Sequence, residues 1–302
     1  LNGWTAGHRM ALLAGRPAPV QVAYMGYPGS TGAGFVDLAV FDRFVAPPEH
    51  AAAFTERLML LPGSYFVTDY RRPELIDEGR GGTRSQHGLA EHSAVLCNHD
   101  KLHKLDPQRF ETWVAAVAAV EGAQLWVLAH AHASDAALLA HAPPSVRGRV
   151  VRGGRESVRR HVARMRHCDV ALDTHGINGH TTAANYLWAQ VPLVTRPTQH
   201  VVGRVAAGML AALGEECGAA AVGLARTEHD YFLLARALAR AAAAARNASA
   251  RLGSGNDDSA RGGIGDDASV REGIGSDVSD RKAADQRSQS AGDAGGEQEG
   301  KW

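Results

Sequence analysis

The residues best suited to chemistry lie between Asp173 and Thr195, where a polar, glycine-containing run leads into an apolar segment. We predict buried strands at Cys168–Leu172 and Val191–Thr195, with a helix over Thr182–Gln190 between them. The start of such a helix can bind an anion, because its unpaired N–H groups and positive dipole end point outward. Three side chains would add donors at this end: His180, Thr181 and Thr182. A threonine that simply caps an ordinary helix is the alternative explanation.

Lys104 is a second group that could act on an anion. It follows a predicted strand at Ala94–Asn98 and precedes a predicted helix over Asp106–Val120, in which Pro107 occupies the first position. Facing the helix start, Lys104 would complete a cationic clamp that needs no metal. At an effective dielectric constant near 20, one such contact at about 4 Å is worth roughly 4 kcal/mol before desolvation. The alternative is a solvated surface lysine.

Strands alternate with helices of about 10 to 20 residues from Ala94 to Arg246, which predicts a parallel α/β sheet with ligands at the carboxyl ends of its strands. The other expected elements are strands at Gln124–Ala129 and Arg149–Arg152, helices at Ser134–Ala142, Glu156–Arg166, His200–Leu213 and Glu228–Arg246, and an apolar run at Ala219–Leu224. Thr227 and Asp230 are spaced as a capping box for the last helix.

Residues 1–95 alternate more weakly. The elements expected there are strands at Val20–Met25, Val36–Phe41 and Tyr65–Asp69, a short helix at Glu49–Leu58 and a polar linker at Arg71–Gln86. The loop Gly26–Gly32 would let the backbone approach a ligand closely, although a simple glycine turn explains it equally well.

The composition changes after Asn247. Three imperfect copies of a unit of about ten residues begin near Leu252, Gly262 and Glu272. Each copy holds few large apolar residues, so it cannot offset the entropy lost on ordering. We therefore expect residues 247–302 to be disordered.

Charge and cysteine content exclude several classes of protein. Lys plus Arg and Asp plus Glu number 32 each, so bulk electrostatic binding of nucleic acid or of an anionic membrane is not expected. No apolar run reaches the length of a membrane span, and no signal peptide opens the chain. The three cysteines are scattered, which favours reduced thiols over a disulfide framework. The 15 histidines show no spacing typical of a metal site, so no metal is expected.

Four stretches in order resemble the catalytic region of the protein O-GlcNAc transferases, family 41 of the glycosyltransferases. They are Arg16–Gln21 with Gly26–Gly32, Leu96–Asn98 with Leu102–Pro107, Asn178–Thr182 with Leu187–Thr195, and Arg204–Ala207. The resemblance covers roughly residues 1–245. It implies an α/β fold of the GT-B type, with two Rossmann-like lobes built on parallel sheets.

The resemblance also implies a division of the chain. Residues 1–92 would be the remnant of a truncated N-terminal, acceptor-side lobe, residues 93–246 the nucleotide-sugar lobe, and residues 247–302 a low-complexity tail that replaces a further helical segment. The family's helical repeats and a histidine proposed as its acid–base group would precede the region matched by Leu1. We therefore expect the chain to be a fragment.

The resemblance assigns roles to individual residues. Lys104 and His180 would be catalytic. The nucleotide-sugar contacts would come from Lys101, Lys104, Val158, His161, Arg164, His180, Thr181, Thr182 and Asn185, with His161 stacked on the base. The sugar and acceptor cleft would include Gly26, Tyr27, Pro28 and Gly29. Three positions depart from the family, which has lysine at Val158, glutamine at Lys101 and aspartate at Asn185.

The implied activity is transfer of N-acetylglucosamine from UDP-GlcNAc to Ser or Thr hydroxyls of proteins in the cytoplasm or nucleus, with inversion and without a cofactor. The partners would be UDP-GlcNAc and protein or peptide acceptors, with no nucleic acid and no membrane. One alternative is a protein O-fucosyltransferase of the Spindly type that uses GDP-fucose, although Gly179–Thr182 favours UDP-GlcNAc. The other is an inactive nucleotide-binding fragment.

Overall fold

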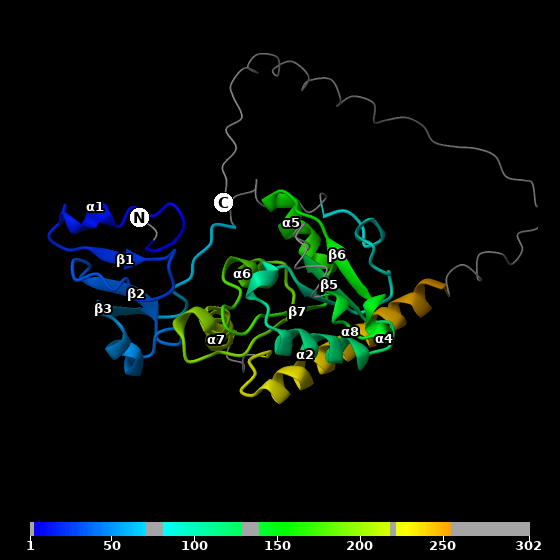
Figure 1. Ribbon diagram of the computed structural model, residues 1–302. Coiled ribbons are helices and arrows are strands. Elements are labelled where there is room, and N and C mark those ends of the chain that lie inside the picture. Colours follow the sequence, from blue (N-terminus) through cyan, green and yellow to red (C-terminus); the bar gives the residue numbers. More distant parts are fainter. Residues whose placement is uncertain (1–2, 71–80, 129–138, 218–221, 255–302) are drawn as a thin grey trace, which may run out of the picture. The chain divides into compact units, whose positions relative to one another are not determined.

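Two parallel β-sheets form the framework of the chain (Figure 1). The computed structural model describes residues 3–70, 81–128, 139–217 and 222–254. In the first sheet the strands follow the order β1-β2-β3, and in the second they follow the order β6-β5-β4-β7-β8.

The first sheet consists of β1 (Val22–Tyr24), β2 (Leu38–Asp42) and β3 (Arg57–Leu61). A short helix α1 (Ala11–Ala14) precedes it, and a 3-10 turn (Pro48–Ala53) joins β2 to β3. Two predictions are wrong here. The helix expected over Glu49–Leu58 ends at Ala53, and the third strand lies at Arg57–Leu61 instead of Tyr65–Asp69. The apolar run Arg57–Leu61 favours a helix locally, but pairing along β2 decides its conformation.

The second sheet consists of β4 (Val95–Asn98), β5 (Gln124–Leu128), β6 (Val150–Gly153), β7 (Val170–Leu172) and β8 (Leu193–Val194). All its pairings are parallel. All five strands fall at positions that the sequence pattern predicted, within two residues at each end.

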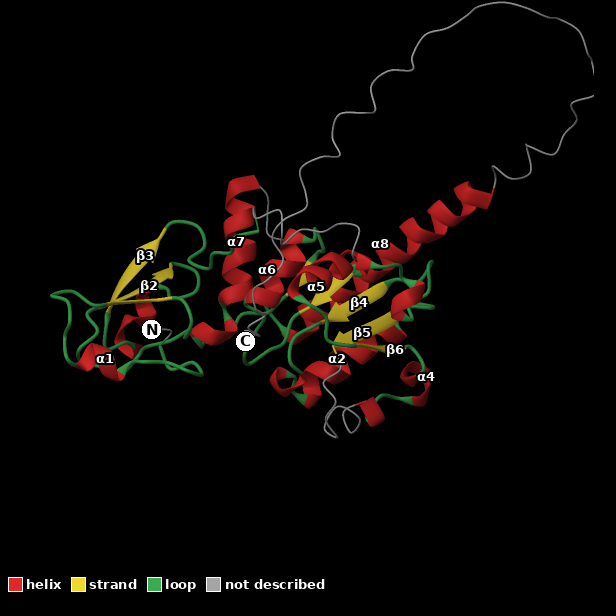
Figure 2. Ribbon diagram, turned by 90° about the horizontal axis from the view of Figure 1, so that it is seen from above, coloured by secondary structure: helices red, strands yellow, loops and turns green. Residues whose placement is uncertain are grey.

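Helices cover both faces of the second sheet. They are α2 (Pro107–Ala118), α4 (Pro144–Arg147), α5 (Val158–Arg164), α6 (Thr181–Trp188), α7 (Val205–Cys217) and α8 (Glu228–Ser254). Along β4, Leu96 joins the core formed with α2 and α8, whereas Val95 and Cys97 join the core formed with α6 and α7. Figure 1 shows α2 and α8 side by side on their face of the sheet; Figure 2 gives the view from above.

Two predicted helix starts are confirmed. The Asp106 carboxylate accepts from the Arg109 N–H at 2.8 Å, as expected for an N-cap followed by proline. Thr227 and Asp230 form the reciprocal capping box of α8.

The end of the last helix was predicted wrongly. Helix α8 runs to Ser254, eight residues past the expected end at Arg246, because alanine and arginine continue to favour a helix there. Residues 247–254 are therefore not part of a disordered tail. The rest of the tail, most of the helix expected at Ser134–Ala142 and part of the run Ala219–Leu224 lie outside the described residues.

The cysteine prediction is also wrong. Cys97 and Cys168 form a disulfide with a Cα–Cα distance of 5.9 Å. The two residues are 71 positions apart, and only the pairing of β4 with β7 brings them together. Spacing along the chain gave no sign of this contact.

Contacts also join the first sheet's segment to helices of the second. The Arg204 Nε donates to the Phe44 carbonyl at 2.9 Å, and Val45 and Tyr65 share a core with residues of α6 and α7. Among the described residues, no helix combines the length and the apolar character that a membrane crossing requires.

Candidate functional site

The site predicted from the sequence lies where the strand order of the second sheet reverses. The chain runs outward from β4 through β5 to β6, and then returns to β7 and β8 on the other side of β4. The carboxyl ends of β4 and β7 therefore lie side by side, with loops leaving in opposite directions. In open parallel sheets, ligands bind in the crevice at such a switch point.

Lys104 is held across this switch point. It ends a 3-10 turn (Leu102–Lys104) after β4, and its Nζ donates to the Asp100 Oδ1 at 2.9 Å and to the Asn178 carbonyl at 3.1 Å. Thr182 Oγ1 donates to the same Asp100 oxygen at 3.0 Å. Asp100, Lys104, Asn178 and Thr182, together with the neighbouring Asp173, are called the Lys104 cluster below. The Lys104 side chain is 18% exposed, so it is held by its two contacts and is still reachable from solvent.

Asp173 is the buried carboxyl of the Lys104 cluster. It accepts from the Gly179 N–H at 2.7 Å and from the Thr195 hydroxyl. Burial, followed by the nearby Asp100 charge, raises the pKa of Asp173 to about 7. Near neutral pH the Asp173 carboxyl is therefore protonated in part of the molecules and ionised in the rest. The net charge of the cluster varies with pH for this reason.

His180 is the N-cap residue of α6, where its backbone φ of −105° and ψ of −85° are non-helical. Its side chain does not cap the helix; the ring Nε2 lies 3.1 Å from the Val202 carbonyl. Burial lowers the pKa of His180, so the ring is neutral at pH 7. Thr181 is exposed, and the Thr182 hydroxyl donates its hydrogen bond to Asp100. Neither threonine is the N-cap, contrary to the simple capping explanation.

Gly179 is required by close packing in this loop. A Cβ at this position would lie 3.0 Å from the Asp100 Oδ2 and 3.2 Å from the Ala183 backbone nitrogen. The loop after β7 can thus press against both the carboxylate and the helix start only with glycine there.

His161 and Arg164 form a second pair on α5. Arg164 is buried, donating from Nη1 to the Gly154 carbonyl at 2.8 Å and placing Nη2 2.9 Å from the His161 Nδ1. Burial and the adjacent guanidinium lower the pKa of His161 to about 4. The imidazole is therefore uncharged at neutral pH and held by one edge, which suits it to stack on an aromatic base.

The three residues that depart from the family differ in their exposure to solvent. Val158 begins α5 with 62% of its surface exposed, and Lys101 is exposed. Asn185 is buried on α6, where its side-chain oxygen accepts from the Tyr70 hydroxyl. The contacts of these residues with a nucleotide sugar stay a prediction.

The loop with Gly26, Tyr27, Pro28 and Gly29 follows β1 in the first sheet. Gly26 has a φ of +84°, and the Gly29 N–H donates to the Tyr27 carbonyl at 3.1 Å. Tyr27 packs tightly against Gly3, which joins the loop to its own segment. Its place in a sugar and acceptor cleft stays a prediction.

Sequence analysis missed the two carboxylates that organise the site. Asp100 holds both Lys104 and Thr182, and Asp173 fixes the loop at Gly179. A usable signal existed, because each acidic residue follows the last strand residue by one or two positions, at the sheet edge where ligands bind.

The fold and the site define the class of protein: a parallel α/β protein with the Lys104 cluster at the switch point of its second sheet. The particular family follows from the model of "Glycosyl transferase family 41", which matches residues 1–77 and 80–260. The chain belongs to this family, and its fold is of the GT-B type.

Individual relatives are consistent with this family assignment. The chain is 37% identical over 222 residues to a probable UDP-N-acetylglucosamine–peptide N-acetylglucosaminyltransferase, SEC, of Arabidopsis thaliana, a match that covers 71% of this chain and 22% of that protein. A SPINDLY protein of Petunia hybrida is 28% identical, over 79% of this chain and 25% of its own length. A mutant O-GlcNAc transferase of Thermobaculum terrenum superimposes with a TM-score of 0.65 at 25% identity, covering 80% of this chain and 45% of that one. The chain spans about a quarter of the curated relatives it matches.

Proposed function

We propose that this chain contributes the donor side of an enzyme that transfers N-acetylglucosamine from UDP-GlcNAc to Ser or Thr hydroxyls of proteins. The observation that carries the proposal is Lys104, held by Asp100 and the Asn178 carbonyl at the switch point, beside the start of α6. The family membership supports it, as does the similarity to relatives named as UDP-N-acetylglucosamine–peptide N-acetylglucosaminyltransferases.

The chemistry follows from this placement. The acceptor hydroxyl oxygen attacks the anomeric carbon as the bond from that carbon to the diphosphate oxygen breaks, which inverts the configuration. Negative charge develops on the departing diphosphate, and the Lys104 ammonium together with the α6 N–H groups would stabilise it. Because a lysine and a helix N-terminus supply the positive charge, this step requires no metal ion or other cofactor.

The nucleoside would bind along α5. The neutral ring of His161 offers a face for the base, and the buried Arg164 fixes the orientation of that ring. Uracil and guanine differ in size and in hydrogen-bonding groups, so this subsite would choose the donor.

Two alternatives remain to be separated from this proposal by experiment. The first is the protein O-fucosyltransferase of the Spindly type with GDP-fucose as donor; the SPINDLY protein of Petunia hybrida carries the name of a UDP-N-acetylglucosamine transferase and does not favour it. An apolar Val158 exposed at the start of α5 favours a lobe that binds a nucleotide without transferring a sugar.

Thermal unfolding with UDP, GDP and their sugars separates these functions. A ligand at 100 times its Kd should stabilise the chain by about 2.7 kcal/mol. Stabilisation by UDP and UDP-GlcNAc alone supports the proposal, and stabilisation by GDP alone replaces it with the fucosyltransferase function. If UDP binds but no sugar reaches a Ser/Thr peptide, the non-catalytic lobe is correct for this chain. A response to neither nucleotide overturns the donor site.

A cytoplasmic or nuclear location is part of the proposal. Those compartments keep thiols reduced. In such a compartment the Cys97–Cys168 disulfide would be reduced to two thiols, so the properties of the reduced pair matter for the protein.

A further inference from the structure

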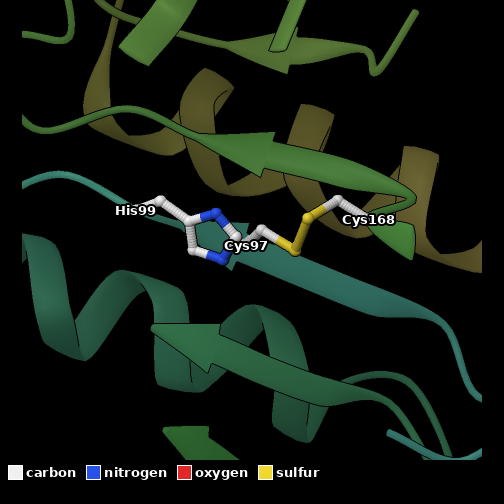
Figure 3. A group of neighbouring side chains, drawn as sticks. All are labelled: Cys97, His99 and Cys168. Carbon is white, nitrogen blue, oxygen red and sulfur yellow. A yellow bond between two sulfur atoms is a disulfide. The ribbon is translucent and has the colours of Figure 1, made fainter. Parts of the chain in front are cut away.

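Three potential metal ligands meet in the core on the α6 side of β4. Cys97, His99 and Cys168 each offer one ligand atom, and these atoms all lie within 4.8 Å of one another (Figure 3). All three residues are buried, and in this structure the two sulfur atoms are joined. These three residues are called the Cys97 cluster.

The fold explains why these residues meet. Cys97 and His99 are two positions apart at the end of β4, and alternate residues of an extended chain project to the same side. Cys168 lies just before β7, and Cys97 pairs with Ala171 in that neighbouring strand. One ligand thus comes from a segment 71 residues away in the sequence.

His99 is an unusual residue to enclose in this way. It is 3% exposed, and neither ring nitrogen has a hydrogen-bond partner among the described residues. Its neighbours are aromatic: Trp126 meets it edge-on at 4.6 Å, and Tyr186 lies 5.7 Å away between ring centroids. A buried polar group without a partner costs about 1–3 kcal/mol, so this imidazole lacks an interaction that it would normally have.

We propose that the reduced Cys97 cluster binds one soft d10 metal ion, Zn²⁺ or Cu⁺, through two thiolates and one imidazole nitrogen. A thiol or phosphine reductant supplies two electrons, and two protons are taken up as the sulfur–sulfur bond becomes two thiols. The ion then displaces both protons and binds the thiolates. A nitrogen of His99 completes the set and gains the partner that it lacks.

The donor set selects this class of ion. Thiolate and imidazole ligands suit Zn²⁺ and Cu⁺, whereas Ca²⁺ and Mg²⁺ prefer oxygen. Two thiolates would neutralise Zn²⁺, which limits the cost of enclosing charge, but Zn²⁺ requires a fourth ligand such as water. A Cu⁺ ion would be satisfied by the three ligands present.

The test uses the full 302-residue chain with Cys217→Ser, which leaves the pair as its only cysteines. The protein is reduced with a phosphine under anaerobic conditions, mixed with Zn²⁺ or Cu⁺, freed of excess metal by gel filtration and analysed for metal content. Co²⁺ in place of Zn²⁺ would show thiolate charge-transfer absorption. We expect one ion per reduced chain and none per oxidised chain; retention of one ion and not the other identifies the metal.

Variants test the ligand set. His99→Phe and Cys168→Ser should each weaken binding by about a hundredfold or more, since losing even an indirect contact to a metal site costs about 10- to 100-fold. His92→Phe, an exposed histidine outside the cluster, should bind as the parent does. Far-ultraviolet circular dichroism of each variant shows whether it is folded.

Two results would overturn the proposal. One is a folded, reduced chain that retains neither ion. The other is unchanged affinity in folded His99→Phe, which would leave His99 without a ligand role. Metal content is the readout, so the outcome does not depend on whether the chain transfers sugar.

Discussion

The Lys104 cluster and the Cys97 cluster both begin at the end of β4, at the neighbouring residues Asp100 and His99. They differ in whether their polar atoms have hydrogen-bond partners. In the Lys104 cluster, Asp100 accepts from both Lys104 and Thr182. In the Cys97 cluster, both nitrogens of His99 lack partners among the described residues. The first cluster is thus held in place by its own contacts before any ligand arrives. The second is complete only when something is added to it, and three predictions test this contrast.

The largest effect should come from the proton on Asp173. Its pKa of about 7 in the folded chain exceeds its ordinary value of 3.8, so the folded state holds a proton that the unfolded state has released. Stability from this group is complete below about pH 4 and is lost as the pH rises through 7. The gap corresponds to roughly 4 kcal/mol.

Asp173→Asn mimics the protonated acid and should remove this loss. Urea unfolding of both proteins from pH 4 to pH 8 should show the wild type falling relative to the variant by up to about 4 kcal/mol. The low pKa of His161 has the opposite effect on stability over part of this range, and it cancels in the difference. A difference that does not change with pH would mean that Asp173 is ionised in the fold, and that the cluster carries a full second negative charge.

Under the proposed function, Lys104→Ala should lower transfer from UDP-GlcNAc by about a hundredfold or more, because removing one hydrogen-bond donor to a transition state typically costs that much. The measurement is turnover with a Ser/Thr peptide. Lys101→Ala is the comparison variant: this exposed lysine is also a predicted nucleotide-sugar contact but is not part of the Lys104 cluster, so its loss should lower turnover by less than about tenfold. Equal losses from both lysines would show that general positive charge, and not the fixed Lys104 ammonium, is what matters.

The smallest effect concerns His99 in the oxidised chain without metal. His99→Phe replaces a buried ring that has unpaired nitrogens with an apolar one, and it should raise the unfolding free energy by about 1 kcal/mol. His103→Phe, at an exposed site, should change it by less than about 0.5 kcal/mol. Destabilisation by His99→Phe would mean that an ordered water already satisfies the imidazole, and the contrast between the two clusters would disappear.

The second sheet could be predicted from sequence because its signals are local. Buried runs such as Val95–Asn98 and capping residues such as Asp106 and Thr227 act through neighbours within a few positions. The first sheet is less regular. Arg57–Leu61 looks helical by composition, and only its pairing with β2 makes it a strand.

The candidate site divides in the same way. Lys104 and Thr182 were identified from motifs. For their common partner Asp100 the sequence offers only its place after β4, and its contact to Thr182 has no local signal because it crosses 82 residues. The Cys97–Cys168 bond was missed for the same reason. Sequence patterns indicated which residues could bind a ligand or act in catalysis, whereas the pairing of β4 with β7 decides which of them are in contact.

That pairing has a consequence for how the chain folds. Leu96 pairs with Val170, and Lys104 contacts Asn178 across 74 residues, so both clusters depend on closing a long loop. Helices α2 and α8 are long enough to form early, whereas parallel strands joined by distant contacts form slowly. Neither cluster can therefore form before β4 and β7 have paired, so a chain in which only α2 and α8 are folded has no site for a ligand.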